Sequence, residues 1–168
     1  MSEIRKAALL VGAGDAIGAA VARRFAAGGY AVCIARRDPS KSQPLVEEMK
    51  AAGHEVHAFA VDARKEAEVQ SLCEQVERDV GPIEVCLFNA GSNVNKPLLE
   101  TTERLFFKAW ELACYAGFLV GREAARYMSL QRAISLATFP SRHRRSRRDG
   151  WAGAATVQDR LARTSLQE

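Results

Sequence analysis

The chain has 168 residues, of which 48% are hydrophobic and 26% are charged. This length suits one compact domain, and the composition excludes collagen-like, coiled-coil and wholly disordered chains. The net charge of +4 is uneven: residues 1–130 hold 16 Lys or Arg against 17 Asp or Glu, whereas residues 131–168 hold eight Arg, no Lys and three acids. We therefore expect a globular body at 1–130 and an Arg-rich tail at 131–168.

Short apolar runs alternate with helical patterning along the body. The run at 7–11 is typical of a strand buried on both faces, a second apolar run lies at 30–35, and the third and fourth expected strands lie at 56–61 and 83–88. Stretches with helical patterning lie at 16–28, 39–53, 69–80 and from Thr101 or Thr102 to about 128. This alternation predicts an α/β fold with an open, doubly wound parallel sheet.

The pattern changes beyond residue 128. Residues 133–137 form a candidate fifth strand, but Phe139-Pro140 and the arginine run at 142–148 cannot continue a buried sheet. We expect a sheet truncated after the fourth or fifth strand, with irregular or disordered chain from about 139. The abrupt change of composition suggests a frame change or an alternative splice near residue 130. A solvated charge run is expected here in preference to a nucleic-acid-binding element.

The four cysteines are Cys33, Cys73, Cys86 and Cys114, and no two of them form a C-x-x-C pair. Their apolar surroundings predict buried thiols in a reducing cytosol, with neither a metal site nor a disulfide framework. No stretch reaches the ~20 apolar residues that a membrane-spanning helix requires. We expect a cytoplasmic protein with no membrane partner.

A glycine-rich turn joins the first expected strand to the first expected helix. Its spacing is Gly12-x-Gly14-x-x-x-Gly18. The first two glycines let the backbone turn and approach a ligand, and Gly18 lets helix and strand pack closely. Unpaired backbone N–H groups at the positive end of a helix suit a pyrophosphate. The alternative for this turn is close packing without a ligand.

Two further motifs follow later strands, namely Asp62 after the third and Asn89-Ala90-Gly91 after the fourth. With the glycine turn, they make the chain resemble the short-chain dehydrogenase/reductase family, whose fingerprint is G-x-x-x-G-x-G followed by N-N-A-G. Ala16 stands in place of the middle glycine, and Phe88 in place of the first Asn. The resemblance covers about residues 6–130.

The resemblance implies a Rossmann-like dinucleotide-binding domain over residues 1–130. The glycine turn would hold the pyrophosphate, Asp62 would hydrogen-bond the adenine, and the N-A-G motif would line the nicotinamide ribose. An alternative role for Asp62 is a helix N-cap. With the residues that follow strand two, the candidate cofactor residues are Gly12, Gly14, Asp15, Ile17, Gly18, Arg36, Arg37, Asp62, Ala63, Asn89, Ala90 and Gly91.

The end of the second strand bears on the choice of cofactor. An NAD site places a carboxylate on the ribose 2′-hydroxyl, whereas an NADP site places a cation near the 2′-phosphate. The chain has Arg36-Arg37-Asp38 here, and guanidinium groups bind phosphate with two parallel hydrogen bonds. The sequence therefore predicts NADP(H) in preference to NAD(H). The alternative is a solvated pair of loop charges.

The catalytic pattern of the family is missing. Carbonyl reduction in the family uses a Tyr, a Lys four residues later and a Ser. Tyr30, Tyr115 and Tyr127 are followed four positions on by Ile, Leu and Gln, and no Lys follows Lys108. The further Asn of the family falls at Cys114. The sequence thus offers no catalytic residue.

Two classes of function remain. The first is an oxidoreductase lineage that binds NADP(H) and acts on alcohol or carbonyl groups, with impaired or no catalysis in this chain. The second is a catalytically silent dinucleotide-binding module, or a subunit that docks on an intact homologue or on itself through helix 103–128. The resemblance implies that this helix builds oligomer interfaces in the family. The substrate is not predicted by the sequence.

Overall fold

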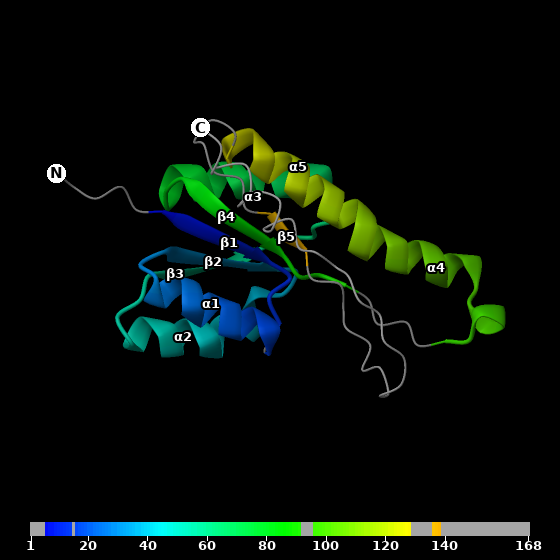
Figure 1. Cartoon of the computed structure of the whole chain (residues 1–168), viewed down its shortest axis with the longest axis horizontal. Coiled ribbons are helices and arrows are strands. Elements are labelled where there is room, and N and C mark those ends of the chain that lie inside the picture. Colours follow the sequence, from blue (N-terminus) through cyan, green and yellow to red (C-terminus); the bar gives the residue numbers. More distant parts are fainter. Residues whose placement is uncertain (1–5, 15, 92–95, 129–135, 139–168) are drawn as a thin grey trace, which may run out of the picture.

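The computed structural model describes residues 6–14, 16–91, 96–128 and 136–138, the last three as backbone only. Figure 1 shows a sheet with helices on both faces and one long helix that extends beyond the sheet. The predictions for residues 139–168, including the arginine run, lie outside the described residues, as do residues 133–135 of the candidate fifth strand.

Every neighbouring pair of strands in the sheet is parallel, and the strand order is β3-β2-β1-β4-β5. The strands are β1 (Ala7–Val11), β2 (Ala31–Arg36), β3 (Val56–Ala60), β4 (Ile83–Phe88) and β5 (Leu136–Thr138). In the register, Leu9 of β1 lies between Cys33 of β2 and Cys86 of β4. The predicted α/β fold with a parallel sheet is therefore confirmed, and the described part of the sheet has a short fifth strand beside β4.

The helices follow the predicted order. They are α1 (Ile17–Ala27), α2 (Gln43–Ala51), α3 (Glu66–Asp79), α4 (Glu103–Trp110) and α5 (Ala116–Met128). A 3₁₀ turn, Pro39–Ser42, precedes α2, and a π-helical segment, Glu111–Tyr115, joins α4 to α5. The hydroxyl of Thr102 accepts a hydrogen bond from the backbone N–H of Leu105 at 3.3 Å, which confirms the predicted start of the long helix.

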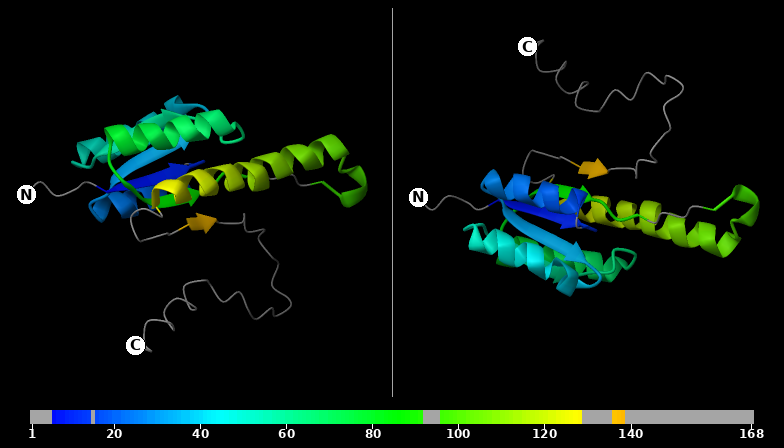
Figure 2. Two further views of the ribbon diagram at one scale, coloured as in Figure 1. Left: turned by 90° about the horizontal axis from the view of Figure 1, so that it is seen from above. Right: turned by 90° about the horizontal axis from the view of Figure 1, so that it is seen from below.

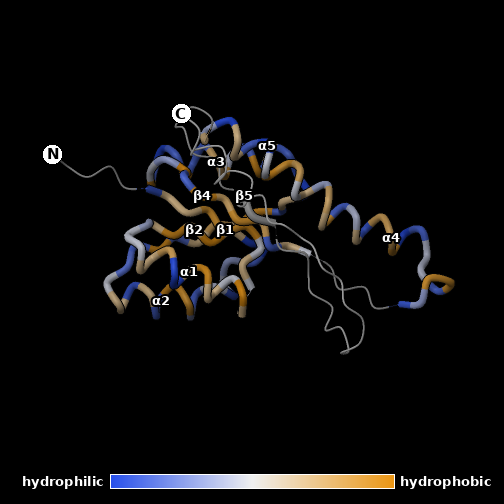
Figure 3. The backbone as a smooth tube through the Cα atoms, viewed as in Figure 1, coloured by the Kyte–Doolittle hydropathy of each residue, from blue (hydrophilic) through white to orange (hydrophobic). Residues whose placement is uncertain are grey.

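Alternate residues of the central strand serve two separate cores, because successive strand side chains point to opposite faces. Leu10 packs with the strand and helix residues of the α1–α2 face, including Met49. Leu9 and Val11 pack on the other face, where α5 contributes Leu119. All five residues of β1 are at most 1% exposed, which explains their unbroken apolar run. Figure 3 shows hydrophobic colour concentrated along β1, β2 and β4.

Helix α4 leaves the sheet, as both views of Figure 2 show. None of its residues is buried, whereas α5 buries six residues. Phe106, Phe107 and Trp110 of α4 are 46–58% exposed. The first part of the long helix therefore carries aromatic surface that the described residues do not cover.

The cysteines fall into two groups. Cys33, Cys73 and Cys86 are buried, and desolvation raises the pKa of each thiol to about 12. Cys114 is exposed, so the prediction of a buried thiol is wrong there. The physical reason is its place in the π-helical segment, none of whose residues is buried.

Within the described ranges, no helix is both long enough and apolar enough to cross a membrane. The same residues include no group of three or more side chains arranged to hold a metal ion.

Candidate functional site

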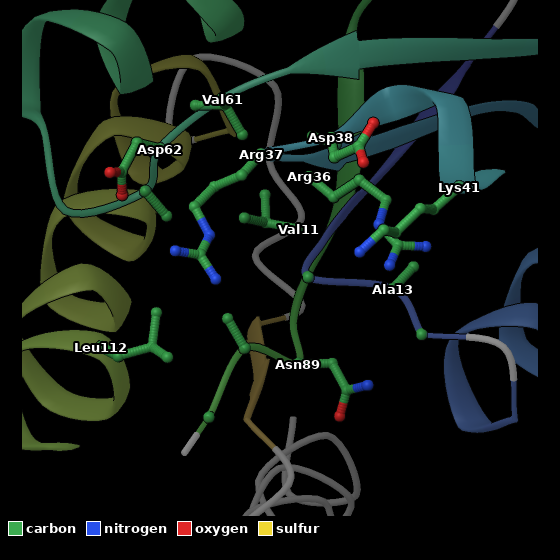
Figure 4. A pocket seen from close by; sticks show the side chains of 16 residues that line it. Val11, Ala13, Arg36, Arg37, Asp38, Lys41, Val61, Asp62, Asn89 and Leu112 are labelled. Atoms are coloured by element: carbon green, nitrogen blue, oxygen red, sulfur yellow. The ribbon is translucent and has the colours of Figure 1, made fainter.

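A pocket opens at the carboxyl edge of the sheet, where the chain runs from β1 to β2 on one side while β4 lies on the other. This is the topological switch point at which open α/β sheets bind ligands. The cavity is about 510 Å³. Figure 4 shows the residues that line it. They are Val11, Gly12, Ala13, Gly14, Ala35, Arg36, Arg37, Asp38, Lys41, Val61, Asp62, Ala63, Asn89, Ala90, Gly91 and Leu112.

Most of the predicted cofactor residues meet in this one pocket. Those that line it are Gly12, Gly14, Arg36, Arg37, Asp62, Ala63, Asn89, Ala90 and Gly91. Two predicted residues are not among the lining residues: Gly18, which is buried in α1, and Ile17, whose surface is 56% exposed. Asp15 lies outside the described residues.

The glycines of the turn have different physical roles. Gly12 has φ +79°, and a Cβ there would lie 2.6 Å from the backbone nitrogen and the Cβ of Ala90. A Cβ on Gly18 would lie 2.5 Å from the Cα of Ala13. Close packing therefore accounts for these two positions. A Cβ on Gly14 would meet nothing within 4 Å, so this residue faces open space at the pocket.

Helix α1 begins beside the turn without a side-chain cap. Ala16 is its N-cap residue and makes no side-chain hydrogen bond, and its first turn contains no acidic residue. The backbone N–H groups at the start of a helix lack intrahelical partners and carry partial positive charge. The start of α1 is therefore suited to an anionic group that enters the pocket beside Gly14.

The last residue of β2 and the loop after it bring three cations to the pocket, and two of them share one end of it. Figure 4 shows the side chains of Arg36 and Lys41 directed toward the end near Ala13, whereas Arg37 extends toward the middle. The carboxylate of Asp38 accepts hydrogen bonds from the backbone N–H and the hydroxyl of Ser40, at 3.2 and 2.5 Å. These bonds, chiefly the one from the hydroxyl, lower the pKa of Asp38.

The loop after β3 contains a rigid ion pair. The carboxylate of Asp62 accepts hydrogen bonds from Nε and Nη2 of Arg64 at 2.8 and 2.6 Å, and from the Arg64 backbone N–H at 3.2 Å. The guanidinium holds the pKa of Asp62 at about 2. The N-cap of α3 is Lys65, so the alternative that Asp62 caps this helix is wrong.

The loop after β4 is tied to the glycine turn by backbone hydrogen bonds. The N–H of Asn89 donates to the carbonyl of Val11 at 2.8 Å, and the N–H of Gly12 donates to the carbonyl of Ala35 at 2.8 Å. These bonds continue the sheet ladder just past the strand ends. The first bond holds the start of the N-A-G motif beside Val11, the residue before the glycine turn, and the second joins the turn to β2.

Sequence reasoning missed several residues at the site. Lys41 and Leu112 line the pocket, and Arg64 orders Asp62 from just outside it. The position of Lys41 in a polar loop and the D-x-R spacing of Asp62 and Arg64 are local signals that could have indicated two of them. Leu112 approaches from the π-helical segment, at a sequence distance that gives no local signal.

The described part of the pocket is lined by no tyrosine. Tyr115 stacks on Trp110 with ring centroids 6.1 Å apart, and Tyr127 packs against the core beside α3 and α5. The carboxylates of Asp38 and Asp62 are hydrogen-bonded to Ser40 and Arg64. The described lining otherwise offers cations, backbone N–H groups and the amide of Asn89, which are suited to holding a phosphorylated ligand.

The doubly wound sheet and the glycine turn at its switch point define a nucleotide-binding α/β protein. The model of the short chain dehydrogenase family matches residues 6–142. The chain therefore belongs to the short-chain dehydrogenase family, an oxidoreductase family whose fold binds an NAD(P) dinucleotide.

Individual relatives agree with this assignment. A short-chain dehydrogenase from Rhodopseudomonas palustris is 45% identical, with a TM-score of 0.75 over 79% of this chain and 62% of that one. The 2,3-dihydro-2,3-dihydroxybenzoate dehydrogenase of Bacillus subtilis is 31% identical over 81% of this chain and 52% of its own length. A structure of F189W actinorhodin polyketide ketoreductase with NADPH is 25% identical, with a TM-score of 0.70 over 75% of this chain and 48% of that one. The chain spans about half or less of the length of its first curated relatives.

Proposed function

We propose that this chain binds NADP(H), in preference to NAD(H), in the pocket at the carboxyl edge of the sheet. The observation that carries the proposal is the meeting of the glycine turn, the Arg36-Arg37 pair and the N-A-G motif around one cavity. The related actinorhodin ketoreductase was solved with NADPH, which also supports it.

In this proposal each part of the dinucleotide lies on one loop. The pyrophosphate lies against the start of α1, where Gly14 leaves room for it. The adenine lies beside Asp62 and Ala63, with Arg37 extending across the pocket toward it. The nicotinamide ribose lies against Asn89 and the residues that follow it.

The preference for the phosphorylated cofactor rests on charge. Arg36 and Lys41 are directed toward the same end of the pocket, and a phosphate monoester carries about −1.5 to −2 charges at neutral pH. The acid of the loop, Asp38, caps the 3₁₀ turn through Ser40 instead of standing as an unengaged acceptor for a ribose hydroxyl.

We propose further that the chain comes from an oxidoreductase lineage that acts on alcohol or carbonyl groups, with impaired or no turnover of its own. The bound nicotinamide supplies hydride transfer in this chemistry. The residues of this chain bind and orient the dinucleotide. The sequence has no Tyr-x-x-x-Lys to move the proton, and the resemblance to the family implies that its further Asn falls at Cys114. With three buried thiols, a reducing cytosol is the proposed compartment.

A second candidate function is a binding module that docks through helix 103–128, on another copy of the chain or on an intact homologue. The exposed aromatic side chains of Phe106, Phe107 and Trp110 favour it. Aromatic residues are enriched at protein interfaces, where their large surfaces are removed from water. This function is compatible with dinucleotide binding, because none of these three aromatic residues lines the pocket.

Thermal unfolding of the purified chain tests the proposal. A ligand that binds only the folded state stabilises it by RT ln(1 + [L]/Kd). We expect one cooperative transition, raised by excess NADPH and raised less by the same concentration of NADH. Equal increases of the unfolding temperature would contradict the preference for NADP(H). No increase with either nucleotide would contradict the proposed function.

A further inference from the structure

The loop after β3 and the π-helical segment Glu111–Tyr115 meet at one edge of the dinucleotide pocket. We infer that a nucleotide bound in the pocket acts through this contact on the long helix, ordering the π-helical segment and, with it, α4. The inference rests on the proposed dinucleotide binding. It adds a form of regulation, because occupancy of the pocket then controls how α4 is presented to a partner.

Helix α4 has little contact with the body of the protein. None of its residues is buried, and the element that it chiefly contacts is the π-helical segment that follows it. Its exposed aromatic side chains, which we call the aromatic face of α4, are Phe106, Phe107 and Trp110. Segments with few buried apolar contacts open locally at a small cost in free energy. The order of α4 therefore depends on what holds the π-helical segment.

Two contacts of the π-helical segment involve the pocket. Nη1 of Arg64 lies 3.5 Å from Oε2 of Glu111, while the other two nitrogens of the same guanidinium bind Asp62, which lines the pocket. The next residue of the segment, Leu112, lines the pocket itself. No residue of the segment is buried. Its start is therefore held beside the pocket by one long ion pair and one apolar side chain.

The π-helical segment also separates an anchored helix from an unanchored one. Helix α5 buries six residues, whereas α4 buries none. At the end of the segment Tyr115 packs against the core, and its ring stacks on that of Trp110 of α4, with centroids 6.1 Å apart. Single π-helical turns are rare and are frequently found at functional sites. A change at the pocket is therefore passed to α4 and its aromatic face at this turn.

A bound nucleotide strengthens both contacts. A ligand surface against Leu112 removes apolar area from water, which is favourable. The side chains of Arg64 and Glu111 are 32% and 45% exposed, and opposite charges attract more strongly when a ligand excludes water from their surroundings. The nucleotide therefore favours the ordered π-helical segment. By linkage, an ordered segment favours nucleotide binding to the same degree.

Hydrogen–deuterium exchange of the full chain with and without NADPH tests the inference. NADPH is supplied at about 100 times the dissociation constant measured for each protein by isothermal titration, so that every protein is nearly saturated. In wild type, the amides of residues 105–116 should exchange roughly fivefold or more slowly with NADPH, as expected for coupled sites. Glu111→Gln should reduce this slowing to less than about twofold, and Leu112→Ala should reduce it in part. Glu74→Gln, which changes an exposed acid of α3 outside the pocket, is the matched control and should keep the full slowing.

The outcomes separate the two proposals. If the titration shows that wild type binds neither NADPH nor NADH, the proposed function and the inference are both contradicted. If wild type binds NADPH but residues 105–116 exchange equally fast with and without it, only the inference is contradicted. The same holds if Glu111→Gln keeps the full slowing, or if the slowing appears only at high protein concentration, where self-association would cause it. Glu111 is not buried, so its replacement leaves the core intact.

Discussion

The guanidinium of Arg64 holds the carboxylate of Asp62 through two N–H donors, at 2.8 and 2.6 Å. The same guanidinium reaches Glu111 of the π-helical segment at 3.5 Å. One cation thus links the adenine end of the proposed site to the long helix. Since Leu112 also lines the pocket, the π-helical segment is part of the wall of the site and not only a connection between α4 and α5.

The Asp62–Arg64 pair makes stability depend on pH in a defined direction. The pKa of Asp62 falls from 3.8 to about 2 on folding, so the folded protein favours the ionised carboxylate. The resulting stabilisation is fully present above about pH 4 and is lost as the pH falls through 2. Arg64→Met should lower the free energy of unfolding by about 1 kcal/mol at pH 7. The effect is modest because the Asp62–Arg64 ion pair is partly exposed to solvent.

Urea unfolding of wild type and Arg64→Met between pH 2 and pH 7 measures this effect. The difference between the two proteins should shrink below pH 4. Lys50→Met, which removes an exposed lysine of α2, is the control and should unfold like wild type at every pH. A difference that stays constant from pH 7 to pH 2 would contradict the role given to Asp62.

Substitutions of Gly12 and Gly14 distinguish an effect on folding stability from an effect on ligand binding. Gly12→Ala forces a side chain into φ +79° and toward Ala90, so it should cost roughly 1–3 kcal/mol of stability. Gly14→Ala meets no protein atom within 4 Å and should change stability by less than about 1 kcal/mol. It should nevertheless reduce the thermal shift with NADPH, because the added methyl group occupies ligand space. If NADPH raised the unfolding temperature of Gly14→Ala as much as that of wild type, Gly14 would not belong to the proposed pyrophosphate site.

The positions of the strands could be predicted from the sequence, because buried strand positions require apolar residues. β1 is buried on both faces, so it reads as one unbroken apolar run, and Ile83–Phe88 was predicted with its observed bounds. The N-cap of the long helix could also be predicted from the local sequence, since the Thr102 hydroxyl accepts a hydrogen bond from the backbone only three residues later.

The parts that were missed depend on contacts between distant segments. Cys114 has apolar neighbours in the sequence, but none of the residues of its π-helical segment is buried, and the thiol is exposed. Leu112 lines the pocket because the π-helical segment lies beside the loop after β3, where Arg64 reaches Glu111 at 3.5 Å. Arg64 is the exception, because it lies two residues from Asp62 and the D-x-R spacing is a local signal for their ion pair.

Thiol labelling tests the environment of the cysteines. A thiolate is the reactive form, and burial raises the pKa of Cys33, Cys73 and Cys86 to about 12. With a disulfide reagent at pH 8, we expect one thiol to react quickly and three to react only on unfolding. Cys114→Ser should remove the fast phase and leave the slow reaction unchanged. Two or more fast thiols in the folded protein would contradict the described packing of the sheet.

The aromatic face of α4 predicts self-association. Phe106, Phe107 and Trp110 are about half exposed, and hiding such side chains in an interface is favourable by roughly 25 cal/mol per Å² of apolar area. Sedimentation equilibrium should show dimers or larger species for wild type, and Phe107→Ser combined with Trp110→Ser should shift them toward monomers. None of these residues belongs to a core, so the thermal midpoint at low protein concentration should change little. A monomeric wild type at high concentration would contradict self-association and would leave an intact homologue as the partner of this helix. We would then expect the two chains to co-purify, and the same double substitution should abolish their co-purification.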